Sequence, residues 1–279
     1  MIRDITIGQY YPSDSVIHRL DPRVKLAGTL LYIISIFFVQ NWIGFVLAIL
    51  MFGVVVKMAK IPLSYMVRGL KSILILLIFS VVMNLFLIRE GKVLVHFWII
   101  TITDKGVMTA GFLAMRLTLL VLGSSLMTLT TTPLALTDGL ERAMRPLKKI
   151  HVPVHEIAMM MSIALRFIPI LLEETDKIIK AQQARGADFE SGNLLQRAKA
   201  MVPILVPLFI SAFRRAEDLA TAMESRCYRG DVGRTRMKEL VYSRNDKIAY
   251  VLILLGAALL IASRYLPFAS LFAGTGGTI

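Results

Sequence analysis

Long uninterrupted runs of apolar residues dominate the chain. Five of them cover residues 26–39, 42–56, 72–88, 106–131 and 248–263. At about 1.5 Å of rise per residue, each run can cross or nearly cross a hydrocarbon core of roughly 30 Å as a helix. The pattern therefore predicts an all-α polytopic membrane protein with about five transmembrane helices.

The stretch between the fourth and fifth runs has a different pattern. It contains two long segments, 155–185 and 196–226, which begin apolar and end charged. Prolines interrupt both apolar halves, at Pro169 and at Pro203 and Pro207. The ends are too polar for a membrane span, and the starts are too apolar around the circumference for a soluble helix. We therefore expect two long helices that lie along the membrane face, between the spans and a partner protein.

These patterns divide the chain into three predicted regions. Residues 1–131 form an N-terminal transmembrane region of about four spans, 132–247 contain the two long helices, and 248–279 hold a last span and an outer tail. Residues 92–103 (KVLVHFWIITIT) are too few for a helical span and are rich in β-branched and aromatic residues. They favour an interfacial or re-entrant element at the outer surface.

Composition and charge support a membrane location and give its orientation. Hydrophobic residues make up 56% of the chain, and the mean hydropathy is +0.67. Residues before 26, from 57 to 71 and from 132 to 247 carry 27 of the 32 Lys and Arg. Because five spans place these stretches on one side, the positive-inside rule puts them in the cytoplasm. We expect a plasma-membrane protein with its N-terminus and long helices inside and its C-terminus outside, and no nucleic-acid partner.

Few residues suggest chemistry. Cys227 is the only cysteine, which excludes an intramolecular disulfide and a multi-cysteine metal site. His151 and His155 are separated by Pro153, and no cluster of acids or cysteines accompanies them, so we expect no metal. The chain has no G-x-x-x-x-G-K-[ST] motif for ATP. We therefore expect no cofactor and no ATP site within the chain itself.

Two other classes of membrane protein remain as alternatives. A membrane-embedded lipid enzyme would need clustered Asp, His, Cys or Lys near a membrane face, and the acids here are scattered along helix ends. A self-sufficient channel or secondary transporter would show paired intramembrane charges or symmetric broken helices. Arg116 is an arginine within a predicted span, and no Asp or Glu lies inside another span. We expect it to face the bundle interior or a backbone carbonyl.

Two arginines close the long segments in similar contexts. Arg185 lies in AQQARG and Arg226 in AMESRCYRG. Arginine in a last helical turn interacts favourably with the helix dipole, and Gly186 suits a left-handed C-cap. Alternatively, an arginine between small residues at a helix tip suits a partner groove that offers a carboxylate. Cys227 in place of a second glycine argues against simple capping at the second copy.

Several motifs together resemble one family. They are HRLDPRVKL (18–26), LTTTPLALTDGLERAMRPLKKI (129–150), SIALRFIPILLEE (162–174) and the two arginine motifs. The chain resembles the transmembrane T component of energy-coupling factor (ECF) importers, of the EcfT/CbiQ type. The resemblance implies a non-catalytic subunit of an importer for vitamins or metal ions. Its partners would be two ABC-type ATPase subunits, a membrane-embedded substrate-binding S component and membrane lipid.

The resemblance also implies roles for particular residues. The long segments would be coupling helices whose tips dock into the ATPases, and their apolar faces would hold the S component, with methionines as adaptable contacts. The N-terminal motif of the family corresponds to Asp21, Pro22, Arg23 and Lys25. The docking residues would be Ala184, Arg185, Gly186, Ser225, Arg226 and Cys227, and the S-component contacts Met159, Met160, Ile163, Phe167, Ile204 and Leu208.

Overall fold

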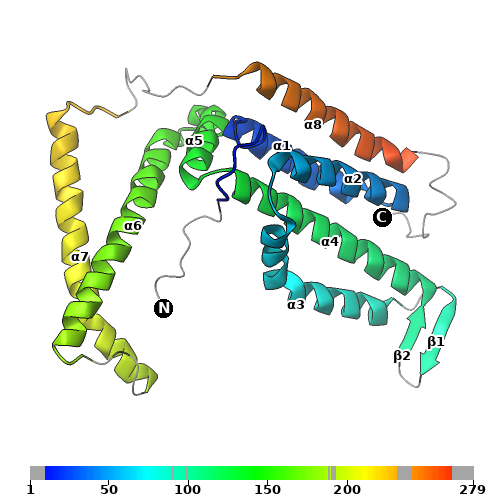
Figure 1. Ribbon diagram of the computed structural model, residues 1–279, viewed down its shortest axis with the longest axis horizontal. Coiled ribbons are helices and arrows are strands. Elements are labelled where there is room, and N and C mark those ends of the chain that lie inside the picture. The colour runs from blue at the N-terminus through cyan, green and yellow to red at the C-terminus, as the bar shows by residue number, and fades with distance from the viewer. Residues whose placement is uncertain are drawn as a thin grey trace. The chain divides into compact units, whose positions relative to one another are not determined.

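The computed structural model describes residues 10–88, 91–97, 100–187, 189, 193–230 and 241–265. It is helical almost throughout, which confirms the all-α prediction (Figure 1). The helices are α1 (Pro22–Phe38), α2 (Trp42–Ala59), α3 (Leu63–Leu87), α4 (Asp104–Thr130), α5 (Pro133–Ala143), α6 (Val154–Ala184), α7 (Leu194–Ser225) and α8 (Arg244–Ala262). Short 3₁₀ turns, η2 (Arg145–Ile150) and η3 (Ser263–Tyr265), follow α5 and α8. The predicted outer tail lies outside the described ranges.

A small hairpin occupies the segment that is too short for a helical span. Strands β1 (Val93–Phe97) and β2 (Ile100–Thr103) pair antiparallel, with Phe97 opposite Ile100. Thr103 then caps α4, because its hydroxyl oxygen accepts the N–H of Gly106 at 3.2 Å. The β-branched residues of this segment thus form strands that lead directly into the next helix.

The chain forms two compact units. The described residues of 10–139 and 241–265 make one, the membrane unit, and those of 140–230 make the other, the helix-pair unit. The division after Gly139 falls inside α5. All five helices that the sequence predicts as spans belong to the membrane unit.

By length and composition, five helices of the described chain could cross a membrane, and the chain is a multi-pass membrane protein. They are α2, α4, α6, α7 and α8. Their number agrees with the prediction but their identity differs in part. The first predicted span is α1, which has only 17 residues, and the third is the broken helix α3, bent by 63° between Leu63–Lys71 and Ile73–Leu87. Length and apolar content alone therefore do not separate the predicted spans from the long helices.

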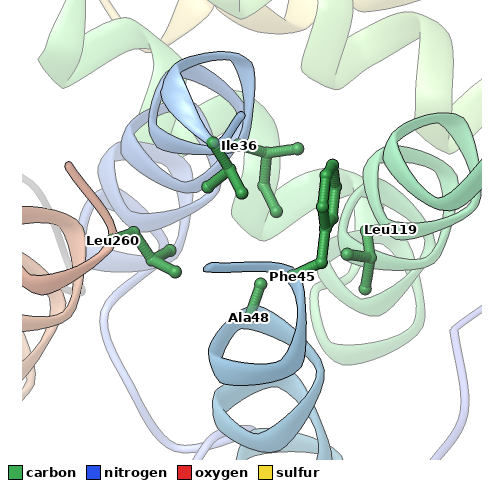
Figure 2. Close-up of a cluster of buried hydrophobic side chains, with 6 residues drawn as sticks. Ile36, Phe45, Ala48, Leu119 and Leu260 are labelled. Carbon is green, nitrogen blue, oxygen red and sulfur yellow. The ribbon is translucent and has the colours of Figure 1, made fainter. Parts of the chain in front are cut away.

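The core of the membrane unit joins four helices. Buried side chains from α1, α2, α4 and α8 meet in one cluster (Figure 2). The Phe45 ring also stacks on Phe112 of α4. The outward faces of helices in this unit carry exposed apolar side chains, such as Leu50 and Ile75. An apolar exterior around an apolar core is typical of a protein that is solvated by lipid. The cluster contains Ile36, Val39, Phe45, Ala48, Leu119 and Leu260.

Two glycines allow helices of this unit to approach closely. A Cβ at Gly123 of α4 would collide with the ring of Tyr32 of α1, and a Cβ at Gly256 of α8 would collide with Met51 of α2. The Tyr32 hydroxyl also donates to the carbonyl of Leu119 at 3.2 Å. Small residues at helix contacts are a general means of packing spans where lipid supplies no hydrophobic drive between helices.

Charged side chains tie the first residues of α1 to the first residues of α8. The Asp21 carboxylate accepts the N–H of Arg23 at 2.9 Å and a bidentate pair from its guanidinium at 3.0 and 2.8 Å. The guanidinium also lies 3.9 Å from the ring centre of Tyr242. Asp246 of α8 accepts the Asp21 N–H at 2.8 Å, and its second oxygen accepts the N–H of Ser243 at 2.8 Å.

The last turn of α4 joins the same cluster. Lys25 donates to the carbonyls of Thr130 at 2.8 Å and His18 at 3.0 Å, and the N–H of Tyr11 donates to the carbonyl of Leu129 at 2.9 Å. These donors satisfy carbonyls that a helix C-terminus leaves unpaired. We call Asp21, Arg23, Lys25 and Asp246 the helix-end clasp.

The opposite ends of these helices are also joined. Arg116 donates to the carbonyl of Val39, the C-cap of α1, at 2.8 Å, which confirms that it faces a backbone carbonyl. Asn41 donates to the carbonyl of Ser263 at 2.7 Å, beyond the end of α8. Helices α1 and α8 therefore run parallel and α4 runs against them, as the predicted five-span order requires.

Replacing Asp246 by Ala should destabilise the membrane unit, because the substitution leaves the buried N–H of Asp21 without an acceptor and removes the acceptor of the Ser243 N–H that begins α8. Losing hydrogen bonds to a buried charged group costs about 1.5–3 kcal/mol. We expect a lower thermal unfolding midpoint in detergent and a smaller decrease for Asp246→Asn, which keeps one acceptor oxygen. An Asp246→Ala midpoint equal to that of Asp104→Ala, at an exposed position, would refute the role of the clasp.

Candidate functional site: two arginine helix tips

Helices α6 and α7 pack against each other in opposite directions (Figure 1). Near the end of α6, Gln182 donates to the carbonyl of Pro203, early in α7, at 3.4 Å. Further back along α6, Glu174 accepts a hydrogen bond from Arg215 at 3.2 Å. Residues nearer the start of α6 therefore contact residues nearer the end of α7. The two C-terminal tips consequently lie at opposite ends of the pair.

The tip of α6 closes with a main-chain capping motif. Arg185 is the C-cap, and Gly186 comes next with a φ of +87°. The N–H of Gly186 donates to the carbonyl of Gln183 at 2.9 Å, and that of Ala187 to Gln182 at 3.0 Å. This pair of bonds is the Schellman motif, in which a left-handed residue reverses the chain.

The tip of α7 closes in the same way, with a cysteine in the place of the glycine. Arg226 is the C-cap, and Cys227 has a φ of +56°. The N–H of Cys227 donates to Glu224 at 2.8 Å, and that of Tyr228 to Met223 at 3.1 Å. The interpretation that Cys227 argues against capping is therefore wrong, since the main chain forms the full motif despite a conformational cost of about 1–2 kcal/mol for a non-glycine residue.

Both arginines are available to a partner. The six predicted docking residues, Ala184 to Gly186 and Ser225 to Cys227, are all exposed. Within the described ranges, the guanidinium groups of Arg185 and Arg226 make no hydrogen bond or ion pair. Counted along α6 at about 1.5 Å per residue, the two tips lie roughly 40 Å apart. Capping and docking are thus compatible, because the main chain completes the cap without using the arginine side chain.

The apolar residues predicted as S-component contacts occupy different environments. Ile163 and Phe167 line a groove of about 290 Å³ between α6 and α7, together with Leu219 and Met223. Ile204 is buried, and Met159 and Leu208 are half-buried. Of the six residues, only Met160 is exposed, by 58%. The widest exposed apolar surface of the pair lies on α7, and we call it the α7 face: Met201, Val202, Leu205, Val206, Phe209, Ile210 and Phe213.

Comparison with known proteins identifies the family. The family model described as CbiQ, cobalt transport protein, matches residues 13–238 of the chain. The chain belongs to the CbiQ family. An energy-coupling factor transporter transmembrane protein EcfT from Clostridium kluyveri is 52% identical to it over 265 residues, which cover 95% of this chain and 98% of that protein. The EcfT of Ruminiclostridium cellulolyticum is 54% identical over 88% of this chain and 92% of its own length.

A more distant relative extends the same likeness. The EcfT of Bacillus subtilis is 45% identical over 93% of this CbiQ-family chain and 98% of its own length. The predicted resemblance to transmembrane components of ECF transporters is thereby confirmed. The family match includes the clasp residues Asp21, Arg23 and Lys25 and both arginine tips.

The residues of the N-terminal family motif have structural roles at helix ends. Asp21 is the N-cap of α1, and Pro22 occupies the first turn. A proline is tolerated there because the N–H groups of the first turn have no partner within the helix. Arg23 and Lys25 belong to the clasp. These residues lie in the membrane unit, whereas both tips lie in the helix-pair unit of this CbiQ-family chain. The motif therefore acts on helix ends of its own unit.

Sequence reasoning missed a polar contact beside one tip. The hydroxyl of Tyr228 lies 3.3 Å from Nε2 of His155 and 3.1 Å from Sδ of Met159. Nδ1 of His155 lies 3.1 Å from a carboxylate oxygen of Glu141. Tyr228 and His155 are 73 positions apart, so only the antiparallel register of the helix pair brings them together. The available signal was a tyrosine two positions after Arg226, where the other tip has Ala187.

The conformation of Cys227 predicts how substitutions affect the α7 tip. Cys227→Val should destabilise the last turn, because a β-branched residue is strongly disfavoured at positive φ. Cys227→Gly should keep the cap, since glycine adopts this conformation without steric cost. Hydrogen exchange at residues 223–228 should accelerate several-fold in the valine variant only. Equal exchange in both variants would mean that the capping motif does not hold this turn.

Proposed function

We propose that this chain is the energy-coupling subunit of an ECF importer for vitamins or metal ions. Two partner ABC-type ATPase subunits bind the arginine tips and hydrolyse the ATP. A membrane-embedded S component binds the substrate and rests on the α7 face. The chain is not an enzyme and needs no cofactor of its own, because its part is to carry movement from one set of partners to the other.

The arrangement of Arg185 and Arg226 carries this proposal. Each is an exposed guanidinium on a helix end that the main chain caps, and small residues on both sides let another surface approach. Such a group suits a bidentate pair with a carboxylate in a partner groove. Two tips of the same construction at opposite ends of one helix pair suit two similar ATPase subunits, one at each end.

The helix pair offers a route for movement. When the ATPases approach each other, the two tips are displaced relative to one another, and α6 and α7 shift along their shared groove. Pro169 in α6 and Pro203 and Pro207 in α7 interrupt the helical hydrogen bonding, so bending concentrates near them. The α7 face lies beside two of these prolines. A shift there changes the orientation of the S component and releases its substrate inward.

The orientation in the plasma membrane is inferred from charge. Helix α2 begins at the Arg116 end of the membrane unit and carries Lys57 in its last turn, with Lys60 beyond it. Because α2 runs from there to the other end, Lys57 and Lys60 lie at the end that also holds the clasp. The positive-inside rule places that end, the N-terminus and the helix pair in the cytoplasm. The C-terminus then lies outside.

The docking role predicts that Arg185→Ala and Arg226→Ala each weaken ATPase binding and that the double variant releases the ATPases. Truncating one partner of a desolvated charge pair costs about 2–5 kcal/mol. The measurement is the ATPase retained per chain after purification of the whole complex. Arg214→Ala, an exposed arginine within α7, is the matched control and should retain wild-type amounts. Wild-type retention and transport by the double variant would exclude the docking role.

The single cysteine provides an independent measurement on the unaltered protein. Cys227 is exposed and adjoins Arg226. A membrane-impermeant maleimide should label it in inside-out vesicles that lack the ATPases and should label it far more slowly when they are bound. Labelling of intact cells from the outside would contradict the proposed orientation. Labelling that is unchanged by the ATPases would contradict docking at this tip.

The proposed contact between the S component and the α7 face predicts a variant that loses the S component but keeps the ATPases. Phe209 is 66% exposed, so Phe209→Glu should fold normally and keep both ATPases, yet lose the S component, because the contact would bury an unpaired carboxylate. Met160→Ala should be tolerated, since neighbouring methionines can repack. Ile204→Glu serves as a contrast: Ile204 is buried, so this change should destabilise the chain itself. Wild-type recovery of the S component with Phe209→Glu would show that the S component does not bind at the α7 face.

A further inference from the structure

The two arginine tips share a backbone cap but differ in the residues next to it. We propose that Tyr228 is a positioning residue that holds the Arg226 tip against the start of α6, so that the two tips are not interchangeable in coupling. The proposal rests on the proposed docking of ATPases at these arginines. It assigns a role to the Tyr228–His155–Glu141 contact, which docking alone does not require.

The geometry of the contact supports a rigid attachment. Tyr228 is bound twice, since its N–H completes the Schellman motif on Met223 and its hydroxyl reaches His155 and Met159 in the first turns of α6. The side chains of His155 and Glu141 are only 11% and 14% exposed. A half-buried hydroxyl among such partners keeps its hydrogen bonds, because water has little access to replace them.

The donors and acceptors of this contact are chemically compatible. The carboxylate of Glu141 accepts only, so the tautomer that fits this contact has its proton on Nδ1 of His155, which donates to Glu141. Nε2 can then accept the Tyr228 O–H, and the Met159 sulfur offers a second, weaker acceptor. The chain of contacts therefore runs from α5 through the first turn of α6 to the residue that closes the α7 cap.

The other tip is built differently. Ala187 occupies the position that corresponds to Tyr228, and its methyl group has no donor or acceptor. Behind that tip, the contact from Gln182 to the carbonyl of Pro203, at 3.4 Å, is exposed, whereas the Tyr228 contacts are partly buried. A displacement of Arg226 is thus passed directly to His155 and Met159 at the start of α6. Within the described residues, a displacement of Arg185 is passed on through this exposed contact and along its own helix.

A spin label tests the attachment without relying on ATPase binding. A nitroxide on Cys227, the only cysteine, should become more mobile in Tyr228→Phe, which removes only the hydroxyl. The matched control carries the label at the other tip, as Gly186→Cys with Cys227→Ser, and should show no change with Tyr228→Phe. Unchanged mobility at Cys227, or an equal increase at both tips, would overturn the proposal.

A double-mutant cycle on the whole complex tests the consequence for coupling. Tyr228→Phe should lower ATPase retention roughly two- to tenfold, the range expected for the loss of one hydrogen bond. This loss should persist in an Arg185→Ala background and vanish in an Arg226→Ala background. Tyr265→Phe, at an exposed tyrosine, controls for the loss of a hydroxyl and should have no effect. Equal losses in both arginine backgrounds would reject a selective role for Tyr228.

The two measurements separate failure of the inference from failure of the proposed function. If Arg226→Ala alone leaves ATPase retention unchanged, the docking proposal fails at this tip, and the spin label still decides whether Tyr228 holds it. If Arg226→Ala releases ATPase while Tyr228→Phe changes neither mobility nor retention, docking stands and the positioning role is rejected.

Discussion

Helix ends are the points on which this structure depends. Every helix leaves N–H groups unpaired at its start and carbonyl groups unpaired at its end, and the interior of a membrane protein has little water to satisfy them. The chain meets this requirement by joining ends from different helices. Lys25 and Arg116 each place a cation on carbonyls at the C-terminal end of a neighbouring helix, and Asp246 accepts N–H groups from two helix starts. The same contacts set the relative directions of α1, α4 and α8.

The arginine tips meet the same requirement by another means. There the main chain satisfies its own carbonyls through the Schellman bonds, so the guanidinium groups of Arg185 and Arg226 are not needed for the cap. Cations that stabilise the fold, such as Lys25, are engaged with backbone oxygens, whereas cations proposed to act on partners are left exposed. How a helix end is capped thus separates a structural basic residue from one that is available for docking.

The sequence predicts the positions of the helices better than it predicts which of their side chains point inward or outward. The apolar runs locate α1 to α4 and α8, and the two long segments end within a residue of α6 and α7. Because residues 201–213 of α7 are apolar on nearly every face, however, periodicity does not reveal that Ile204 faces inward while Phe209 faces outward. The cap at Cys227 was unpredictable for another reason: the surrounding hydrogen bonds outweigh its weak preference for a left-handed conformation. Contacts such as Tyr228 with His155 require the register of two helices, which no local pattern contains.

The antiparallel course of α6 and α7 also has a consequence for symmetry. Because α6 and α7 are similar helices that run in opposite directions, an approximate twofold axis passes between them, perpendicular to the pair. This axis relates their two capped ends. A single chain with no sequence repeat can therefore present a pseudosymmetric surface to a homodimer or to two related subunits, whose own twofold axis would coincide with it. The surface is symmetric in its backbone and asymmetric in its side chains, since glycine and alanine come after one arginine and cysteine and tyrosine after the other. Two identical partners would then be distinguished by the ends they occupy.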